Sequence, residues 1–168
     1  MKNIQLKIRK YLFDFFINGI VMSYFIPSKI RTYILNLLGF NIGKNSIICS
    51  NCYIDSKKLI IGKNSYINKN CLIDNNAEVL VGNNVGIAYN VTILTTNHEY
   101  NNPNKRTGKI NSKKVIIDDG VWIGANCIVL PGTHIQKGVV IGAGSIVKGI
   151  CESNFLYIGC PAKKIKKI

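Results

Sequence analysis

The sequence predicts an all-β solenoid, in which short strands wind around a three-sided coil, preceded by a short helical segment. Two observations predict this fold. From Ile42 onward an aliphatic residue recurs at nearly every sixth position, and Gly or Asn recurs at fixed places between them. A period of six matches neither the 3.6 residues of a helix nor the two of a flat strand. It fits a chain that forms a short strand, turns, and does so three times in each coil.

The aliphatic residues of the repeat should point inward and stack from coil to coil. Three repeats per coil predict one stack of Ile42, Ile61, Val81, Ile117 and Ile135. A small or β-branched residue usually follows four positions later, and one such corner column is Cys52, Cys71, Val91, Cys127 and Ser145. Most cysteines are thereby explained as apolar corner fillers. Turn residues are expected at Asn45, Asn64, Asn84 and Asn126.

Length and composition limit the class of protein. With 168 residues, 47% of them hydrophobic, the chain can form one domain with a real core. Its 22 basic against 8 acidic residues give a net charge of +14, which requires an anionic partner: nucleic acid, anionic lipid or a phosphate-rich cofactor. The six cysteines do not have the spacing of a disulfide scaffold. Cys49-x-x-Cys52 lacks a second pair, so we expect no metal site.

The N-terminal segment, residues 1–40, is expected to be helical and distinct from the solenoid of residues 41–168. Lys2, Lys7, Arg9 and Lys10 precede an apolar run over residues 11–26. Polar residues interrupt this run, it is shorter than the roughly 20 residues of a bilayer span, and no signal cleavage site follows. Two readings remain, a helix docked on its own protein or a basic amphipathic segment in the membrane interface. Both place the protein in the cytoplasm, the second at the inner membrane surface.

A second helix is predicted between Pro27 and Gly39, because Pro suits a first turn and Gly a C-terminal cap. Its apolar face is expected to contain Ile30, Tyr33, Ile34, Leu37 and Leu38. This helix should cover the first coil, whose open strand edges would otherwise promote aggregation.

The C-terminal part carries a family resemblance. The stretch DDGVWIGANCIVLPGTHIQKGVVIGAGSIV, followed by YIGCPAKKIKKI, resembles the maltose and galactoside O-acetyltransferases and the acetyltransferases of capsule, colanic-acid and O-antigen synthesis. These are hexapeptide-repeat enzymes with a left-handed parallel β-helix. The resemblance begins near residue 40 and implies acetyl-CoA as co-substrate, a homotrimer, and active sites in grooves between adjacent subunits.

One long interruption of the repeat, at about residues 94–115, is polar and leaves the coil after Ile93. Such excursions from a rigid scaffold are usually functional. His98 lies near its start, where the resembling enzymes carry their catalytic His. A neutral imidazole suits removal of a proton from a sugar hydroxyl that attacks a thioester. Glu99 is adjacent but should point elsewhere, and His134 is expected to be structural or on the surface.

Further positions follow from the resemblance, residue by residue. It implies CoA contacts at Asn68, Ala125, Ala143, Lys148, Lys163 and Lys166. The two C-terminal lysines replace arginines of the relatives and would contact phosphates as point charges. Asn76 occupies the place of an acidic acceptor contact and lacks its charge. Trp122 follows the inward-facing Val121, so it should face outward, near the His loop of a neighbouring subunit or in plain interface packing.

The expected function is acetyl-CoA-dependent O-acetylation of a sugar in surface polysaccharide or glycoconjugate synthesis. The basic surface and the apolar N-terminus favour a nucleotide-linked or lipid-linked acceptor. The alternative is N-acetylation of a nucleotide-linked amino sugar, which the same scaffold and His would serve. A γ-class carbonic anhydrase would need three zinc-binding His, and the chain has two. A nucleic-acid binder would need basic motifs interleaved with aromatic residues, which are absent from the sequence.

Overall fold

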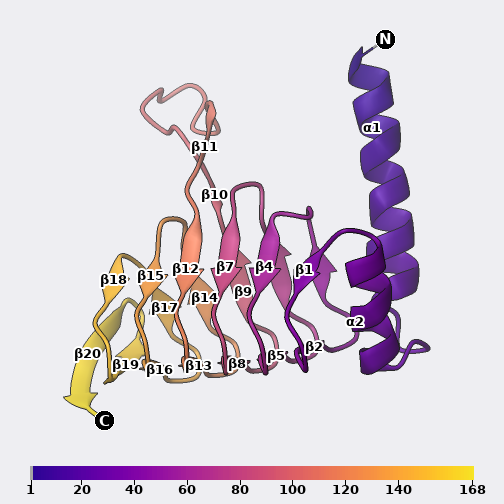
Figure 1. Ribbon diagram of the computed structural model, residues 1–168. Coiled ribbons are helices and arrows are strands. Elements are labelled where there is room, and N and C mark those ends of the chain that lie inside the picture. Colours follow the sequence, from indigo (N-terminus) through magenta and orange to yellow (C-terminus); the bar gives the residue numbers. More distant parts are fainter. Residues whose placement is uncertain (1) are drawn as a thin grey trace.

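The computed structural model describes residues 2–168 and contains a three-sided parallel β-helix preceded by helices (Figure 1). This confirms the predicted fold class. The helical elements are α1 (Lys2–Phe13), the π-helix η1 (Asp14–Val21) and α2 (Ser28–Leu37). Strands begin at Asn41 and continue to Lys167.

The walls of the solenoid are three parallel sheets, named sheet A, sheet B and sheet C here. Sheet A contains β1 (Asn41–Ile42), β4 (Leu59–Ile61), β7 (Val79–Val81), β12 (Val115–Ile117), β15 (His134–Ile135) and β18 (Ile150–Cys151). Sheet B contains β2 (Ile47–Ile48), β5 (Tyr66–Ile67), β8 (Gly86–Ile87), β13 (Trp122–Ile123), β16 (Val140–Ile141), β19 (Phe155–Gly159) and the antiparallel β20 (Ala162–Lys167). Sheet C contains β3 (Tyr53–Ile54), β6 (Leu72–Asp74), β9 (Thr92–Leu94), β14 (Ile128–Val129) and β17 (Ile146–Val147).

The stacking of inward residues is the predicted one. Strand register pairs Ile42 with Ile61, Ile61 with Val81, Val81 with Ile117, and Ile117 with Ile135. All five are buried. In the corner column the cysteine thiols reach carbonyl oxygens of the next coil, as where Cys127 Sγ donates to Gly142 O at 3.1 Å. Where the column holds Cys or Ser, the small side chain therefore fills the corner and also satisfies a backbone acceptor.

Asparagine makes many of the turns. Asn45, Asn64, Asn84 and Asn126 have φ of 63°, 55°, 55° and 58°, the left-handed conformation that Asn tolerates better than most residues. The side chains of Asn45, Asn64 and Asn126 also take part in hydrogen bonds between coils, as where Asn45 Nδ2 donates to Asn64 Oδ1 at 3.1 Å. The predicted turn positions are confirmed.

The first coil is covered by the helices, and each of its strand edges is capped by a polar side chain. Asn36 exchanges two hydrogen bonds with the backbone of Ile42 in β1, at 2.9 and 3.0 Å. Arg31 donates to Ile48 O in β2 at 3.0 Å. Asn18 exchanges two hydrogen bonds with the backbone of Ile54 in β3, at 3.1 and 2.9 Å. The backbone groups of Ile42, Ile48 and Ile54 that these side chains bind are therefore not free to pair with another chain.

The predicted contact face of α2 was right for Ile34 and Leu38, which are half-buried and pack against the core, and wrong for its other three residues. Ile30, Tyr33 and Leu37 are exposed, and the residues that α2 buries are Arg31, Thr32 and Leu35. The reason is the Arg31 guanidinium, which also donates to Val21 O, Ser23 O and Ile26 O at 2.9, 2.8 and 2.6 Å. A buried cation is tolerated when its donors are all used, and this one rotates the helix away from its most apolar side.

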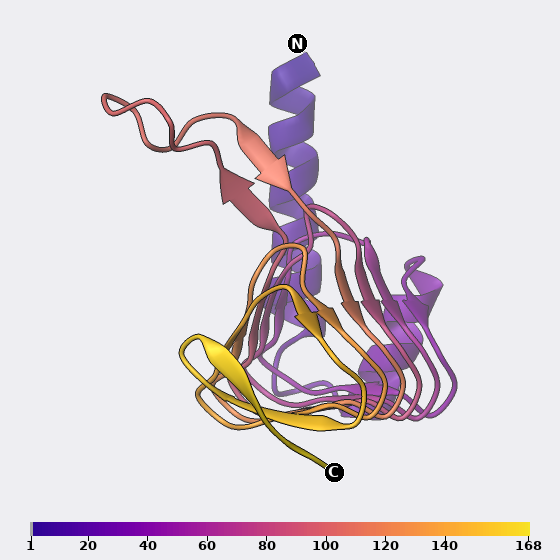
Figure 2. The same cartoon turned by 90° about the vertical axis from the view of Figure 1, so that its left-hand side faces the viewer.

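Two elements leave the solenoid along the same edge. The interruption of the repeat is an arm, residues 95–114, whose root is the antiparallel pair β10 (Thr96–His98) and β11 (Ile110–Ser112). Figure 2 shows this arm and α1 extending beyond the coils in the same direction. Within residues 2–168 no helix combines the length and apolarity needed to span a bilayer.

Candidate active site

His98 lies at the end of β10, where the arm leaves the corner between sheet C and sheet A. Its imidazole is half-buried, and its Nδ1 lies 3.0 Å from the carbonyl oxygen of Gly108 on the returning strand side. A carbonyl can only accept a hydrogen bond, so Nδ1 carries the proton in the neutral ring. Nε2 is then the basic nitrogen.

Gly108, which the sequence analysis did not single out, fixes this geometry. Its N–H donates to Glu99 O at 2.8 Å. A Cβ at position 108 would come within 2.6 Å of the same oxygen. Only Gly therefore allows the two sides of the hairpin to approach closely enough for the Gly108 carbonyl to orient His98.

A hollow of about 310 Å³ opens beside His98. It is lined by arm residues, among them Glu99 and Tyr100, and by Pro131 of the neighbouring coil. Glu99 is exposed, and the orienting partner of His98 is the Gly108 carbonyl. This is consistent with assigning Glu99 no part in positioning the base.

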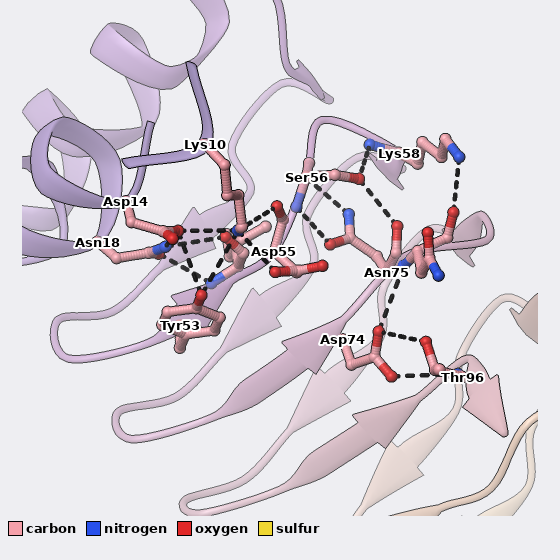
Figure 3. Close-up of polar contacts among 12 residues, drawn as sticks. Lys10, Asp14, Asn18, Tyr53, Asp55, Ser56, Lys58, Asp74, Asn75 and Thr96 are labelled. Atoms are coloured by element: carbon pink, nitrogen blue, oxygen red, sulfur yellow. Dashed lines mark hydrogen bonds and ion pairs between the residues drawn. The ribbon is translucent and has the colours of Figure 1, made fainter. Parts of the chain in front are cut away.

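Asp74, at the end of β6, holds the root of the arm. Its carboxylate accepts from the Thr96 N–H at 3.1 Å and from Thr96 Oγ1 at 2.9 Å (Figure 3). Asn76, two residues further on, donates from Nδ2 to Ser112 Oγ on the returning strand at 3.2 Å. Both strands at the base of the arm are thus tied to the preceding coil.

The polar contacts continue along this edge toward the N-terminus (Figure 3). Asn75 is fully buried and exchanges hydrogen bonds with the backbone of Ser56, at 2.8 and 2.7 Å. Next to Ser56, Asp55 accepts from Lys10 Nζ at 2.6 Å, and Lys10 also donates to Asp14 Oδ1 at 2.9 Å. Burial opposes the charge of Lys10, but the two carboxylates outweigh it and raise the pKa of the amine.

The positions implied for CoA lie mostly on another corner, between sheet B and sheet C. Asn68 follows β5, Ala125 follows β13 and Ala143 follows β16. Ala125 and Ala143 lie on adjacent coils, since Gly144 N donates to Ala125 O at 2.8 Å. Lys163 and Lys166 are exposed on β20, which pairs with the last strand of sheet B.

The remaining predicted positions lie elsewhere. Lys148 follows β17 and Asn76 follows β6, so both lie at the corner between sheets C and A, as the arm does. Trp122 faces outward from sheet B with 56% of its surface exposed, as its place after Val121 predicted. One chain therefore presents the predicted site residues on two corners and one face of the solenoid.

The second histidine is in a different setting. His134 Nε2 lies 2.9 Å from Asp118 Oδ2 on the outer face of sheet A. It lies on β15, which pairs with β12, and it lines no part of the hollow beside His98. Between residues 2 and 168 no group of three His, Cys, Asp or Glu side chains is arranged to hold a metal ion. The pKa of Cys151 is raised to about 11 by burial, which makes this thiol a poor nucleophile.

Two family models match the chain. The bacterial transferase hexapeptide model (six repeats) matches residues 114–149, and the hexapeptide repeat of succinyl-transferase matches residues 31–56. A maltose O-acetyltransferase from Clostridium difficile 630 superposes with a TM-score of 0.87 and 30% identity, over 97% of this chain and 88% of that one. The chain therefore belongs to the hexapeptide-repeat acetyltransferase family.

Two further relatives are informative. A galactoside acetyltransferase solved in complex with coenzyme A has a TM-score of 0.81 and 28% identity, over 95% of this chain and 79% of that one. The putative lipopolysaccharide biosynthesis O-acetyl transferase WbbJ of Escherichia coli is 49% identical over 65 residues, 39% of this chain and 32% of WbbJ. The chain spans about half the length of the curated galactoside O-acetyltransferases it matches, 45% and 57% of theirs.

Proposed function

We propose that this protein transfers the acetyl group of acetyl-CoA to a sugar hydroxyl, with His98 as the general base. The observation that carries the proposal is the hydrogen bond between His98 Nδ1 and Gly108 O, which leaves Nε2 basic beside an open hollow. A histidine base needs one unprotonated ring nitrogen, here Nε2, and is helped by a partner that holds its ring in place.

The steps follow from this arrangement. Nε2 of His98 takes the proton of the acceptor hydroxyl as its oxygen attacks the thioester carbonyl. The C–S bond then breaks, and the protonated imidazole returns the proton to the departing thiolate. The Gly108 carbonyl stabilises the imidazolium that forms between these steps. No covalent intermediate with the protein is needed when both substrates are bound together.

We infer that CoA lies along the corner between sheets B and C. Ala125 and Ala143 form a lane of small side chains there, and a Cβ on the neighbouring Gly124 would come within 2.6 Å of Ala143 N. Small residues leave room for a narrow chain such as pantetheine, and Asn68 could donate to its amide groups. Lys163 and Lys166 supply positive charge for its phosphates. Lys148, on the other corner, would reach CoA only from a neighbouring subunit.

We infer that the working form is a homotrimer. His98 and the Ala125–Ala143 lane lie on different corners of one chain, so a site that combines them requires the corner of a second copy. The exposed Trp122 would then face the arm of that neighbour. Sedimentation would show a trimer in this case, and a monomer with full activity would contradict it.

For the acceptor we propose a sugar of surface polysaccharide or glycoconjugate synthesis, linked to a nucleotide or a lipid. The segment shared with WbbJ and the basic, apolar N-terminus support this class. Asn76 is held by the base of the arm and carries no charge, so selectivity for a simple glucoside or galactoside is not expected. We place the reaction in the cytoplasm at the inner face of the membrane, with contact through residues 1–26.

The test uses the two histidines as a matched pair. His98→Ala should lower acetyl transfer by about 10²- to 10⁴-fold, with CoA binding unchanged by calorimetry. His134→Ala, whose imidazole pairs with Asp118, should keep most of the activity. Labelled acetyl-CoA with a panel of hydroxyl and amino sugars, lipid-linked and nucleotide-linked, identifies the acceptor. Undiminished transfer by His98→Ala would refute the mechanism, and transfer to amino sugars alone would favour N-acetylation.

A further inference from the structure

The N-terminal helix has a docked side and a free side. On the docked side, Lys10 and Asp14 join the ion-pair cluster at Asp55, and Ile17 is buried against the first coil. Phe13 packs against the same core. These residues follow one another at intervals of three and four, so they share one side of the helix.

The free side is apolar. Ile4, Ile8, Tyr11, Leu12 and Phe15 are 63%, 52%, 69%, 56% and 58% exposed. They are linked by steps of three and four residues, which places them on one stripe of the helix, with Leu12 at the edge of the stripe beside Leu38 and Lys57. Single exposed apolar side chains are ordinary, but a continuous stripe of this size marks an interaction surface. We call these five residues the α1 stripe.

Charge indicates what covers the stripe. Lys7 and Arg9 flank it and are exposed, and the helix has no acidic residue in its first turn. A second copy of this chain would offer few free carboxylates to these cations. Those already bonded within the chain are Asp14, Asp55, Asp74, Asp118, Asp119 and Glu152. Lipid phosphates supply the missing anions in quantity.

We propose that the α1 stripe docks this protein onto an anionic lipid bilayer. The helix lies in the interface with its apolar side among the acyl chains and with Lys7 and Arg9 at the phosphates. α1 and the arm extend beyond the same edge of the solenoid (Figures 1 and 2), so a bilayer that takes up α1 along its length runs in the direction in which the arm extends, with His98 at the arm's root. If the protein is the sugar acetyltransferase proposed above, docking on a bilayer favours a lipid-anchored sugar as its acceptor; this part of the inference rests on the proposed function.

Vesicle flotation of the full chain tests the docking. Wild type should float with vesicles of phosphatidylcholine and phosphatidylglycerol, less with phosphatidylcholine alone, and less at high salt. Ile8→Ser or Leu12→Ser should each lower partitioning roughly tenfold. Leu6→Ser is the matched control, because Leu6 is 62% exposed but lies two residues from Ile8 and so on another side of the helix. It should float nearly as well as wild type.

Two results would overturn the inference. One is failure of wild type to float with the anionic vesicles. Self-association that depends on the stripe, measured by sedimentation, would then assign the stripe to a second copy. The other is equal loss of flotation in Leu6→Ser and Ile8→Ser. Circular dichroism and CoA calorimetry of each variant verify folding. If wild-type protein floats with the vesicles but transfers no acetyl group, the proposed function is refuted and the docking inference stands.

Discussion

The solenoid wall and the two elements that leave it place the same residue types in opposite surroundings. In the wall, Ile93 and Ile123 are 1% and 0% exposed, while Ile4 and Ile8 on α1 are 63% and 52% exposed. Each wall strand is hydrogen-bonded to the coils beside it. The arm and α1 are tied down near their roots, by Asp74 and Asn76 in one case and by Lys10 in the other.

This difference separates two tasks. The wall gains its stability from repetition, since every coil buries the same inward column and satisfies its backbone against the next coil. The elements that leave it add little to that core. They carry instead the imidazole and the apolar stripe, the groups whose exposure would be unexplained in a purely structural protein. Four predictions would break or sharpen this division, starting with the largest effect.

Isoleucine truncation compares the two regions directly. Ile123→Ala should lower the free energy of unfolding by about 2–5 kcal/mol, because the wall cannot collapse around the cavity. Ile8→Ala on α1 should change it by less than about 0.5 kcal/mol. Urea denaturation followed by circular dichroism measures both. Similar losses in the two variants would mean that α1 is part of the cooperative core.

The root of the arm should matter for the rate of acetyl transfer as well as for stability. Asp74→Asn loses charge-assisted hydrogen bonds to Thr96, which are each worth about 1.5–3 kcal/mol. We expect acetyl transfer to fall about tenfold as His98 loses its fixed position. The matched control is Asp119→Asn, whose carboxylate accepts from Asn83 at another corner. An equal fall in rate for Asp119→Asn would remove the positioning role.

The asparagine turns should contribute through backbone conformation. Asn126→Ala should cost about 1–2 kcal/mol, because Ala is strained at a φ of 58°. It also loses the hydrogen bond from Asn90 Nδ2 at 3.1 Å. Asn126→Gly should restore the turn and lose only that exposed hydrogen bond. If the Ala and Gly variants have the same denaturation midpoint, the side-chain ladder rather than the backbone is what stabilises the corner.

The smallest expected effect is on the docking of α1 at acid pH. Burial disfavours the ionised form of Asp14, but Lys10 and Asn18 outweigh it and hold the pKa of Asp14 below its usual value. A lowered pKa stabilises the docked helix above the unfolded-state value, about 3.9, and this contribution is lost as the pH falls below it. The ion pair is partly exposed, so the loss should stay below about 1 kcal/mol.

Hydrogen exchange of the η1 amides, corrected for intrinsic rates, would measure this change. Exchange should be constant at neutral pH and faster below pH 4. The raised pKa of Lys10 adds stability that persists below its unfolded-state value and is lost only as strongly alkaline pH is reached. Faster exchange between pH 5 and 7 would contradict the assignment, because neither group changes charge there.

The wall of the solenoid could be predicted from the sequence in detail, whereas the side chains that cap its first coil could not. The six-residue period by itself places Ile42, Ile61 and Val81 in one stack, since each residue in a solenoid meets its own counterpart one coil away. The contact face of α2 was predicted only in part from its apolar spacing: Ile34 and Leu38 pack against the core, but the helix also buries Arg31, which satisfies backbone carbonyls from several separate segments. The hydropathy pattern of a helix does not show which distant backbone carbonyls its side chains will bind.

The site divides in the same way. His98 was found because it interrupts the period, and Trp122 was placed outward by its neighbour Val121. Gly108 and Asp74 were not predicted from the sequence. At Gly108 the two sides of the hairpin approach so closely that no side chain fits, and only glycine allows this. Their partners, His98 and Thr96, lie 10 and 22 residues away in the chain. No local pattern links residues across that distance.

By itself the sequence determined the winding of the coils, their inward columns and their asparagine corners, because a repeated local rule needs no knowledge of the rest of the chain. The tertiary structure alone decided which carbonyl orients His98, which side chains cap the first coil, and which side of α1 stays bare. Those outcomes depend on contacts between segments that follow no common period.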